Sequence, residues 1–302
     1  MEEMTTGLCP KCGHTLQIPA ELERFSCMYC GERLTKRQLL TQPEEASCSE
    51  EDCAVSFDHA VSRLGWCVQN FRGYQKKILR DAFFEAFETY ETGCAPVIQE
   101  LNSGVRPERQ TELLDRAAEA MLDELSAGWE KKNDMEDEKV ILAIFFVPMV
   151  RKLQLPVSEE FVSLLQKKWV ERYPKSPFYL GDYESISGGF RKKFLGLCFI
   201  TTAVCQELGK PDDCAELTAF RAFRDGYLAA QPDGEALIRE YYNIAPGIVT
   251  CINTCSDRHA SYERIREQYL TPCYEDLLAG RNADCKTRYV QMVRDLEREY
   301  LS

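Results

Sequence analysis

Two Cys-x-x-Cys knuckles near the N-terminus limit most strongly what this chain can fold into. Cys9 and Cys12 form the first knuckle, and Cys27 and Cys30 form the second, within the stretch CPKCGHTLQIPAELERFSCMYCG. A two-residue gap lets both thiolates of a knuckle face one tetrahedral ion, and the glycine after each knuckle permits a tight turn behind the sulfurs. Four cysteines complete the coordination shell, so we predict a structural Zn²⁺ site with no catalytic role.

The segment between the knuckles is of the right length for a small β-ribbon with one apolar side. That side would carry Leu16, Ile18, Leu22 and Phe25. A redox Cys-x-x-Cys is the alternative interpretation, but that motif normally occurs singly beside a βαβ pattern. A ribbon of this size buries little apolar surface, so we expect its stability to depend on the metal. Its basic residues are interspersed with glutamates, which favours protein over nucleic acid as its partner.

The charge and the hydropathy of the chain exclude several classes of partner. A formal net charge of −12 over 302 residues repels both a phosphate backbone and an anionic membrane. The first residues lack the pattern of a secretory signal, and the longest apolar run, residues 140–150, is too short to cross a bilayer. We therefore expect a cytoplasmic protein. In a reducing compartment its fifteen cysteines would serve metal binding, thiol chemistry or packing more often than disulfides.

Beyond the knuckles the sequence has the periodicity of helices, apart from an acidic stretch that is typical of a linker. Glycines at 65 and 73 are positioned to bend or split the first helical stretch, and Pro148 to kink a buried central helix. Residues 174–193 are rich in proline, glycine and serine, which predicts a long surface loop. Cys48 and Cys53 lie in the linker, where we expect exposed thiols.

We therefore predict a mainly α fold with a small N-terminal β zinc ribbon. The predicted parts are a zinc ribbon (1–40), an acidic linker (41–56), a helical middle domain (57–190) and a helical C-terminal domain (191–302). Neither strand–helix alternation nor a phosphate-binding glycine loop is visible in the sequence. Kinase, dehydrogenase and NTPase functions therefore have no support.

The C-terminal part begins with the stretch LGLCFITTAVC, in which steps of three, four and seven residues recur. If this stretch is helical, Cys198, Thr201, Thr202 and Cys205 share one face. The next helical pattern places Arg224 inside an apolar stripe, where it must reach solvent or find a carboxylate. Arg221 and Asp225 are four residues apart on that pattern, so the sequence predicts that they pair.

The order of CFITTA, ELTAFRAFRDGYL and YYNIAP resembles the CFI-box C-terminal domain, a bacterial family named for its Cys-Phe-Ile signature. Members usually carry a tyrosine–glycine pair shortly after the signature, where this chain has Cys205 and Gln206. The resemblance implies a bacterial origin and a shared helical domain, and it implies no reaction. The matching positions are Cys198, Phe199, Ile200, Thr202, Glu216, Phe223, Arg224, Asp225, Tyr241, Tyr242 and Pro246. Our candidate functional cluster is Cys198, Thr202, Glu216, Arg221, Arg224, Asp225, Tyr241 and Tyr242.

Two chemical hypotheses compete with plain packing in this region. A nucleophilic Cys198 or Cys205 would need a base to form the thiolate, and His59 or His259 would have to supply it. A further metal could be held by Cys251, Cys255 and His259, which are spaced four residues apart on one helical stripe. Cysteine is often buried as a small apolar residue, which favours packing for these positions.

The preferred function is a protein-interaction or scaffold role. Several tyrosines in the C-terminal region are consistent with it, because tyrosine is enriched at interfaces. The alternative is a cysteine-dependent hydrolase or transferase centred on Cys198. Burial of Cys198 without a nearby histidine would argue against that enzyme.

Overall fold

The computed structural model describes residues 4–9, 15–19, 21–29, 31–36, 49–131, 133–191, 198–255 and 257–301. It divides into two compact units, residues 1–53 and residues 54–302. Each unit has its own apolar core, so we describe each by itself. In the described part of the chain, no helix combines the length and the apolarity that a bilayer span requires.

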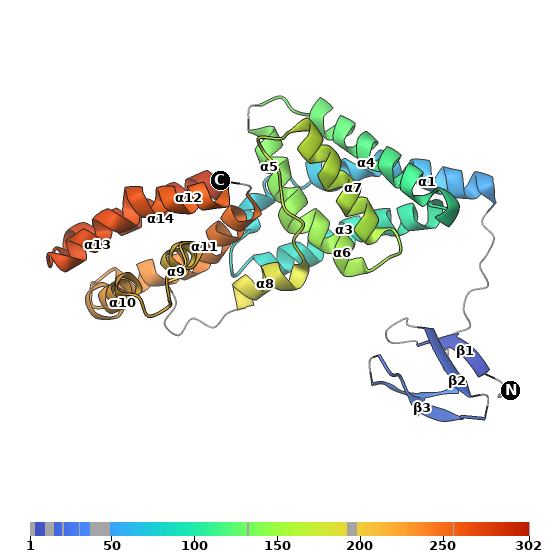
Figure 1. Cartoon of the computed structure of the whole chain (residues 1–302), viewed down its shortest axis with the longest axis horizontal. Coiled ribbons are helices and arrows are strands. Elements are labelled where there is room, and N and C mark those ends of the chain that lie inside the picture. The colour runs from blue at the N-terminus through green and yellow to red at the C-terminus, as the bar shows by residue number, and fades with distance from the viewer. Residues whose placement is uncertain are drawn as a thin grey trace. The chain divides into compact units, whose positions relative to one another are not determined.

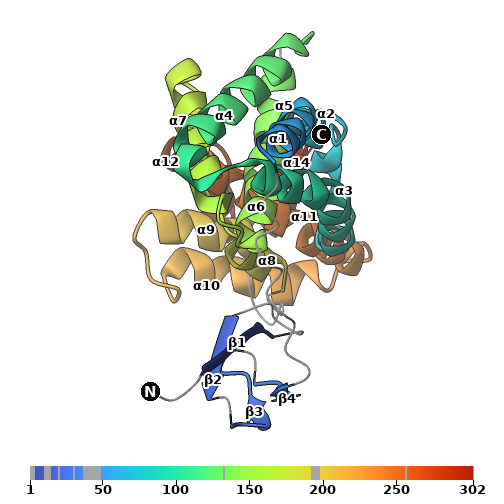
Figure 2. The same ribbon diagram turned by 90° about the vertical axis from the view of Figure 1, so that its right-hand side faces the viewer.

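The N-terminal unit consists of two antiparallel strand pairs (Figure 2). Strand β1 (Met4–Leu8) pairs with β2 (Thr15–Pro19), and β3 (Arg24–Ser26) pairs with β4 (Arg33–Thr35). Gly7 lies opposite Leu16, and Phe25 lies opposite Leu34. Short β-strands at this end of a mainly α fold were predicted, whereas their role as a zinc ribbon stays a prediction.

The second unit is mainly helical, as the sequence predicted (Figure 1). Its α-helices, together with the helix that leads into it, are α1 (Glu50–Leu64), α2 (Trp66–Gln69), α3 (Phe83–Gly104), α4 (Gln110–Ala127), α5 (Asp134–Ile141), α6 (Val147–Leu153), α7 (Ser158–Arg172), α8 (Tyr183–Arg191), α9 (Phe199–Glu207), α10 (Ala215–Ala222), α11 (Gly234–Thr254), α12 (Arg258–Ile265), α13 (Thr271–Leu278) and α14 (Asn282–Tyr300). Short 3₁₀ turns are η2 (Tyr74–Lys77) and η3 (Pro107–Arg109), and π-helical turns are η4 (Leu142–Phe146), η5 (Phe223–Leu228) and η6 (Arg266–Leu270).

Glycines interrupt the first helical stretch where the sequence indicated. Gly65 separates α1 from α2, and Gly73 adopts a φ of 92° before η2, a conformation that a residue with a Cβ rarely takes. Pro148 lies in the first turn of α6, directly after the π-helical turn η4. The proline lacks an N–H and its ring collides with the carbonyl four residues earlier, so the wider turn accommodates it within a continuous, buried run.

Helix α1 begins at Glu50, inside the predicted linker. Ser49 caps it, because its Oγ accepts the backbone N–H of Asp52 at 3.1 Å and donates to the Asp52 carboxylate at 2.7 Å. The acidic residues that resembled a linker occupy the first turn, where the helix dipole favours negative charge. Cys53 is buried rather than exposed, which corrects our expectation. Cys48 and the rest of 41–48 lie outside the described residues.

The predicted surface loop at 174–193 contains a helix, α8. Asp182 accepts the backbone N–H of Ser185 at 2.7 Å and so caps its first turn. Ile186 and Phe190 are buried on its inner side, and Phe190 stacks on Phe83 with ring centroids 4.3 Å apart. The apolar pair is therefore strong enough to order a segment whose composition is that of a loop. The predicted boundary between the two helical domains falls at the end of this helix.

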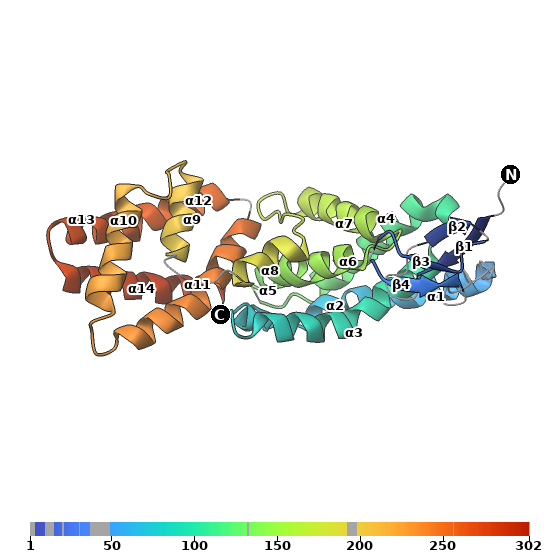
Figure 3. The same ribbon diagram turned by 90° about the horizontal axis from the view of Figure 1, so that it is seen from below.

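Helices α9 to α14 gather at one end of the helical unit, and α11 connects them to the earlier helices (Figure 3). The backbone N–H of Arg80 donates to the Asn243 carbonyl at 3.0 Å, and that of Asp81 donates to Asn243 Oδ1 at 3.1 Å. One turn further along α11, Gly247 lies so close to Ile78 that an added Cβ would stand 1.9 Å from the Ile78 carbonyl oxygen. The joint between the two helix groups thus depends on a residue without a side chain.

We expect Gly247→Ala to destabilise the helical unit by about 1–3 kcal/mol, because the methyl group overpacks against main-chain atoms that cannot rotate away. Urea denaturation followed by circular dichroism measures the change. The matched control is Gly188→Ala in α8, where an added Cβ meets nothing within 4 Å. There the better helix propensity of alanine should leave stability unchanged or raise it by up to about 1 kcal/mol. Equal effects of both substitutions would contradict the close approach.

Candidate functional site

The described cysteines of the predicted zinc site lie together in the core of the N-terminal unit. Cys9 follows β1 directly and Cys27 follows β3 directly, so each hairpin contributes one thiol. Both are buried, at 0% and 2% exposure, in a small cluster with Leu16 and Leu34. Two of the four buried residues in this cluster are therefore cysteines.

The described backbone around Cys27 forms a tight turn. Gly31 adopts a φ of 72° and donates its N–H to the Cys27 carbonyl at 2.9 Å. The Cys27 N–H donates to the Glu32 carbonyl at 2.8 Å, which closes the turn. Cys12 and Cys30, together with Gly13 and His14, lie outside the described residues. The described donors fit Zn²⁺, because buried thiols at a glycine turn are the ligands that structural zinc prefers.

Cys198 is the residue directly before α9. It therefore lies outside the helix whose face it was expected to share with Thr201, Thr202 and Cys205. Its side chain is buried at 4% exposure, and Arg224 Nη1 lies 3.6 Å from its sulfur. Burial raises the pKa of the Cys198 thiol, and the charges of Arg224 and Arg221 offset this effect only in part. The environment therefore favours the thiol over a nucleophilic thiolate.

Two tyrosines cap the start of α9 beside Cys198. The Tyr241 hydroxyl accepts the backbone N–H of Ile200 at 2.9 Å, one of the helix N–H groups that lack an intrahelical acceptor. Tyr289 connects the Tyr241 hydroxyl, at 3.4 Å, with Thr201 Oγ1, at 3.1 Å. Burial raises the pKa values of both tyrosines, so both hydroxyls remain protonated. Tyr241 thus has a structural role that its place in the candidate cluster did not reveal.

The two arginines of the cluster pair differently from our prediction. Arg224 binds both carboxylate oxygens of its neighbour Asp225, at 2.6 and 2.8 Å, and its guanidinium also reaches the hydroxyl of Tyr242. Arg221 instead binds Asp212, through the carbonyl at 2.8 Å and the carboxylate at 2.7 Å. The predicted pairing of Arg221 with Asp225 was therefore wrong, because the chain widens into the π-helical turn η5 directly after α10 and shifts the phase of the later residues.

An apolar cavity of about 60 Å³ adjoins this cluster. Cys198, Phe220, Phe223, Tyr241 and Tyr289 contribute to its wall. Among the described residues, the buried side-chain nitrogen and oxygen atoms without a hydrogen bond are Thr202 Oγ1 and Arg221 Nε. Both atoms belong to the candidate cluster, so two of its polar atoms are buried without a partner in the part of the chain that the structure describes.

The two described histidines each contact a glutamate and not the candidate nucleophiles Cys198 and Cys205. His59 Nδ1 lies 2.7 Å from Glu100, and His259 Nδ1 lies 3.4 Å from Glu207 at the end of α9. Cys198 is at the opposite end of that helix, which spans roughly 13 Å. His259 is 61% exposed whereas Cys251 is 1% exposed, so Cys251, Cys255 and His259, the alternative ligand set that we considered less favoured than packing, do not converge. In the part of the chain that the structure describes, the ligand atoms of these three residues are not close enough to one another to hold a metal ion.

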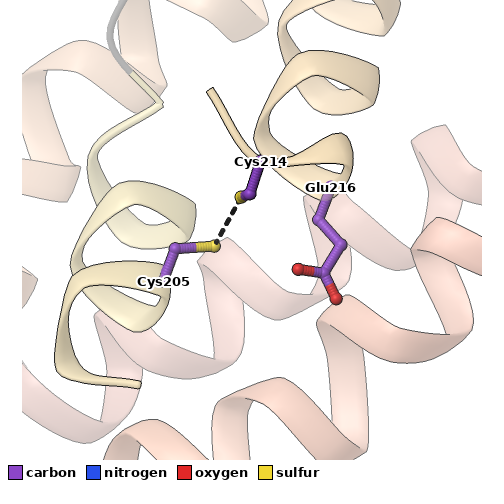
Figure 4. Close-up of side chains that lie close together, drawn as sticks. All are labelled: Cys205, Cys214 and Glu216. Atoms are coloured by element: carbon purple, nitrogen blue, oxygen red, sulfur yellow. Dashed lines mark hydrogen bonds between the residues drawn. The ribbon is translucent and has the colours of Figure 1, made fainter. Parts of the chain in front are cut away.

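Cys205 and Glu216 belong to a second cluster, away from the cap of α9 (Figure 4). The Cys205 sulfur lies 3.8 Å from the sulfur of Cys214, a residue the sequence did not pair with it. Burial and the neighbouring Cys214 thiol raise the pKa of Cys205 to about 12. Lys210 donates to both oxygens of the Glu216 carboxylate. The candidate set thus divides into a cluster around Cys198 and another around Cys205.

A polar groove of about 670 Å³ was not indicated by the sequence. In it Lys139 is buried, donates to Ser176 Oγ at 2.7 Å and pairs with Glu136. The Ser176 hydroxyl in turn donates to the Glu136 carboxylate, so Lys139, Ser176 and Glu136 form a closed set of polar contacts. Lys139 and Ser176 are 37 positions apart in the sequence, and both are residue types common on protein surfaces. No sequence pattern therefore marks this contact.

No protein-family model, no curated protein and no solved structure matches this chain. The resemblance to the CFI-box domain stays a prediction from the residues quoted above. The chemistry of the chain must therefore be inferred from its own geometry.

We expect Cys198 to resist alkylation in the folded protein. At pH 7 iodoacetamide should label it at least about tenfold more slowly than in urea-unfolded protein, because the thiol is buried and its raised pKa reduces the thiolate fraction. Peptide mapping by mass spectrometry measures the rate at each cysteine. Rapid labelling of Cys198 at neutral pH in the folded state would restore it as a candidate nucleophile.

Proposed function

We propose that this chain is a binding protein, in which an N-terminal unit built around structural Zn²⁺ presents apolar side chains to a protein partner and is carried by an α-helical body. The observation that supports this best is the exposure of Met28 and Tyr29, at 75% and 58%. They stand between Cys27 and Cys30, at the tip of the second knuckle. Large apolar side chains exposed on a small rigid turn are typical of a docking surface.

Zn²⁺ would be held by Cys9, Cys12, Cys27 and Cys30, and it would supply the cross-link that the small core lacks. The thiols would donate all four bonds, so no coordination position would remain for a substrate. The unit would then have no catalytic role. The turn at Gly31 would hold Met28 and Tyr29 in a fixed orientation for contact with a partner.

The charge of the chain supports protein as the partner. A net charge of −12 disfavours nucleic acid and anionic lipid, and we propose a cytoplasmic location and a bacterial origin, the latter from the CFI-box resemblance. The alternative enzyme centred on Cys198 is disfavoured, because that thiol is buried, its pKa is raised and the described histidines pair elsewhere.

The experiment is co-purification of the full-length chain from cells that make it, with partners identified by mass spectrometry. The wild type and a Met28→Ser/Tyr29→Ser variant are compared, together with a matched control, Leu278→Ser, whose leucine is 70% exposed on the helical unit. We expect a specific partner to be lost with the double variant and kept with the control. An identical set of partners for all three chains would contradict the proposal.

A further inference from the structure

Two cysteines and a glutamate meet between α9 and α10, and the function proposed above does not use them (Figure 4). Cys205 lies in the last turn of α9, Cys214 is the residue before α10, and Glu216 is in the first turn of α10. One ligand atom from each lies within 4.8 Å of the others. Among the described residues, Cys205, Cys214 and Glu216 are the set of three metal-ligand side chains whose ligand atoms lie close enough together to hold one ion.

The loop between the two helices is folded by its own hydrogen bonds. Gly209, at a φ of 68°, donates to the Gln206 carbonyl, and the Lys210 N–H donates to the Cys205 carbonyl at 2.8 Å, which is the glycine-terminated end of a helix. The Cys214 N–H then donates to the Pro211 carbonyl at 3.1 Å.

Arg221 clamps the same loop through Asp212. The two thiols are therefore brought together by a pre-formed turn, which lowers the entropic cost of binding an ion.

The Cys214 thiol donates a hydrogen bond to the Cys205 sulfur, and a metal ion that replaced this proton would find the sulfurs at a spacing that suits tetrahedral zinc. Two sulfurs that each lie about 2.3 Å from a tetrahedral ion are about 3.8 Å apart. The sulfurs of Cys205 and Cys214 are 3.8 Å apart. The Glu216 carboxylate can complete a third bond by a side-chain rotation, since its side chain is 32% exposed and lies on the same helix turn as Cys214.

The charges at the site are balanced for a divalent cation. Two thiolates and one carboxylate carry three negative charges, and a divalent ion together with the Lys210 ammonium carries three positive charges. Lys210 contacts both Glu216 oxygens, at 2.7 and 2.5 Å, so it can keep one of them while the other binds metal. An adjoining cavity of about 20 Å³ has room for one water as a fourth ligand.

We propose that Cys205, Cys214 and Glu216 form a second metal site, selective for a thiophilic divalent cation such as Zn²⁺, with an exchangeable fourth position. Two sulfur ligands select against Mg²⁺ and Ca²⁺, and three protein ligands leave room for one small ligand. Binding releases the thiol protons, so affinity rises with pH. A redox disulfide fits less well, because redox-sensing cysteines are accessible and Cys205 is 4% exposed.

The test is Co²⁺ binding by the full-length chain carrying Cys9→Ser, Cys12→Ser, Cys27→Ser and Cys30→Ser, so that no N-terminal thiol contributes. We expect one Co²⁺ per chain, with thiolate-to-cobalt charge-transfer absorption and the visible bands of tetrahedral cobalt. Cys205→Ser and Cys214→Ser should each reduce the charge-transfer absorption by half or more. Glu216→Gln, which preserves shape, should keep the charge-transfer bands but weaken Co²⁺ affinity at least about tenfold.

The matched control is Cys255→Ser, which replaces another half-buried cysteine and should leave binding unchanged. The proposal is overturned if the background chain binds no Co²⁺, or if binding survives Cys205→Ser unaltered. Loss of binding with Cys255→Ser, or a Cys205–Cys214 disulfide in metal-free protein isolated under reducing conditions, would also overturn it. None of these results bears on the N-terminal zinc, so the two claims fail separately.

Discussion

Replacing Cys27 with serine is expected to unfold the N-terminal unit and to leave the helical unit folded. The core of the N-terminal unit holds Cys9, Leu16, Cys27 and Leu34, with Phe25 packed against it. Without the metal only a few apolar side chains remain to oppose the chain entropy of the unit. Structural zinc supplies about 10–16 kcal/mol of apparent binding free energy in small zinc-binding peptides, and here that would be the dominant stabilising contribution.

Amide NMR spectra and limited proteolysis of the full-length chain measure this effect. With Cys27→Ser, or after a chelator, the signals of the N-terminal residues should lose their dispersion and cleavage should concentrate before residue 49. The matched control is Met28→Ser, since Met28 is the next residue, is 75% exposed and binds no metal in our account. A Cys27→Ser chain with undisturbed N-terminal signals would show that zinc does not hold this unit together.

Arg72→Ala is expected to destabilise the helical unit by about 2–3 kcal/mol, because it leaves the buried Glu138 carboxylate without its main partner, although Arg72 itself is 38% exposed. The carboxylate of Glu138 has an exposure of 0% and accepts hydrogen bonds from Arg72 Nε at 2.8 Å and from Trp129 Nε1 at 2.7 Å. Arg72 also donates to the Gly128 carbonyl at 3.0 Å. Without the guanidinium, a buried negative charge would keep only the indole N–H.

Urea denaturation followed by circular dichroism measures the loss. The control is Arg109→Ala, which breaks an exposed pair with Glu112 and should change stability by at most about 1 kcal/mol. In the double variant Arg72→Met/Glu138→Leu no buried charge remains, so we expect much of the stability to return. If Arg72→Ala cost no more than Arg109→Ala, the guanidinium would not stabilise the buried Glu138 carboxylate in solution.

The helices of the middle region could be predicted from the sequence because their apolar residues recur at helical spacing. Leu113, Leu114 and Leu125 are buried along α4 as the pattern indicated, and Gly65 and Gly73 split the first helical stretch. Helix α8 and the start of α1 could not be predicted in the same way. Both have the composition of loops. The start of α1 is ordered by its Ser49 cap, and α8 by its Asp182 cap and the contact of Phe190 with Phe83.

The candidate site could be predicted in part. Cys198, Arg224 and Asp225 of the candidate cluster meet, whereas Glu216 lies with Cys205, and the partner of each charge could not be found from spacing. A π-helical turn changes the angle between Arg221 and Asp225, and an eight-residue gap hides the contact of Cys205 with Cys214. Both depend on the exact path of a loop, which the hydrophobic pattern does not determine.

The most direct measurement is the zinc content per chain, by elemental analysis, of the wild type and of the Cys9→Ser/Cys27→Ser variant. Our account predicts that the wild type holds one zinc ion more than the variant, whatever the helical unit binds. Equal zinc contents in the two proteins would contradict the central claim, since the N-terminal unit would then fold without the metal from which we derived its stability and its role.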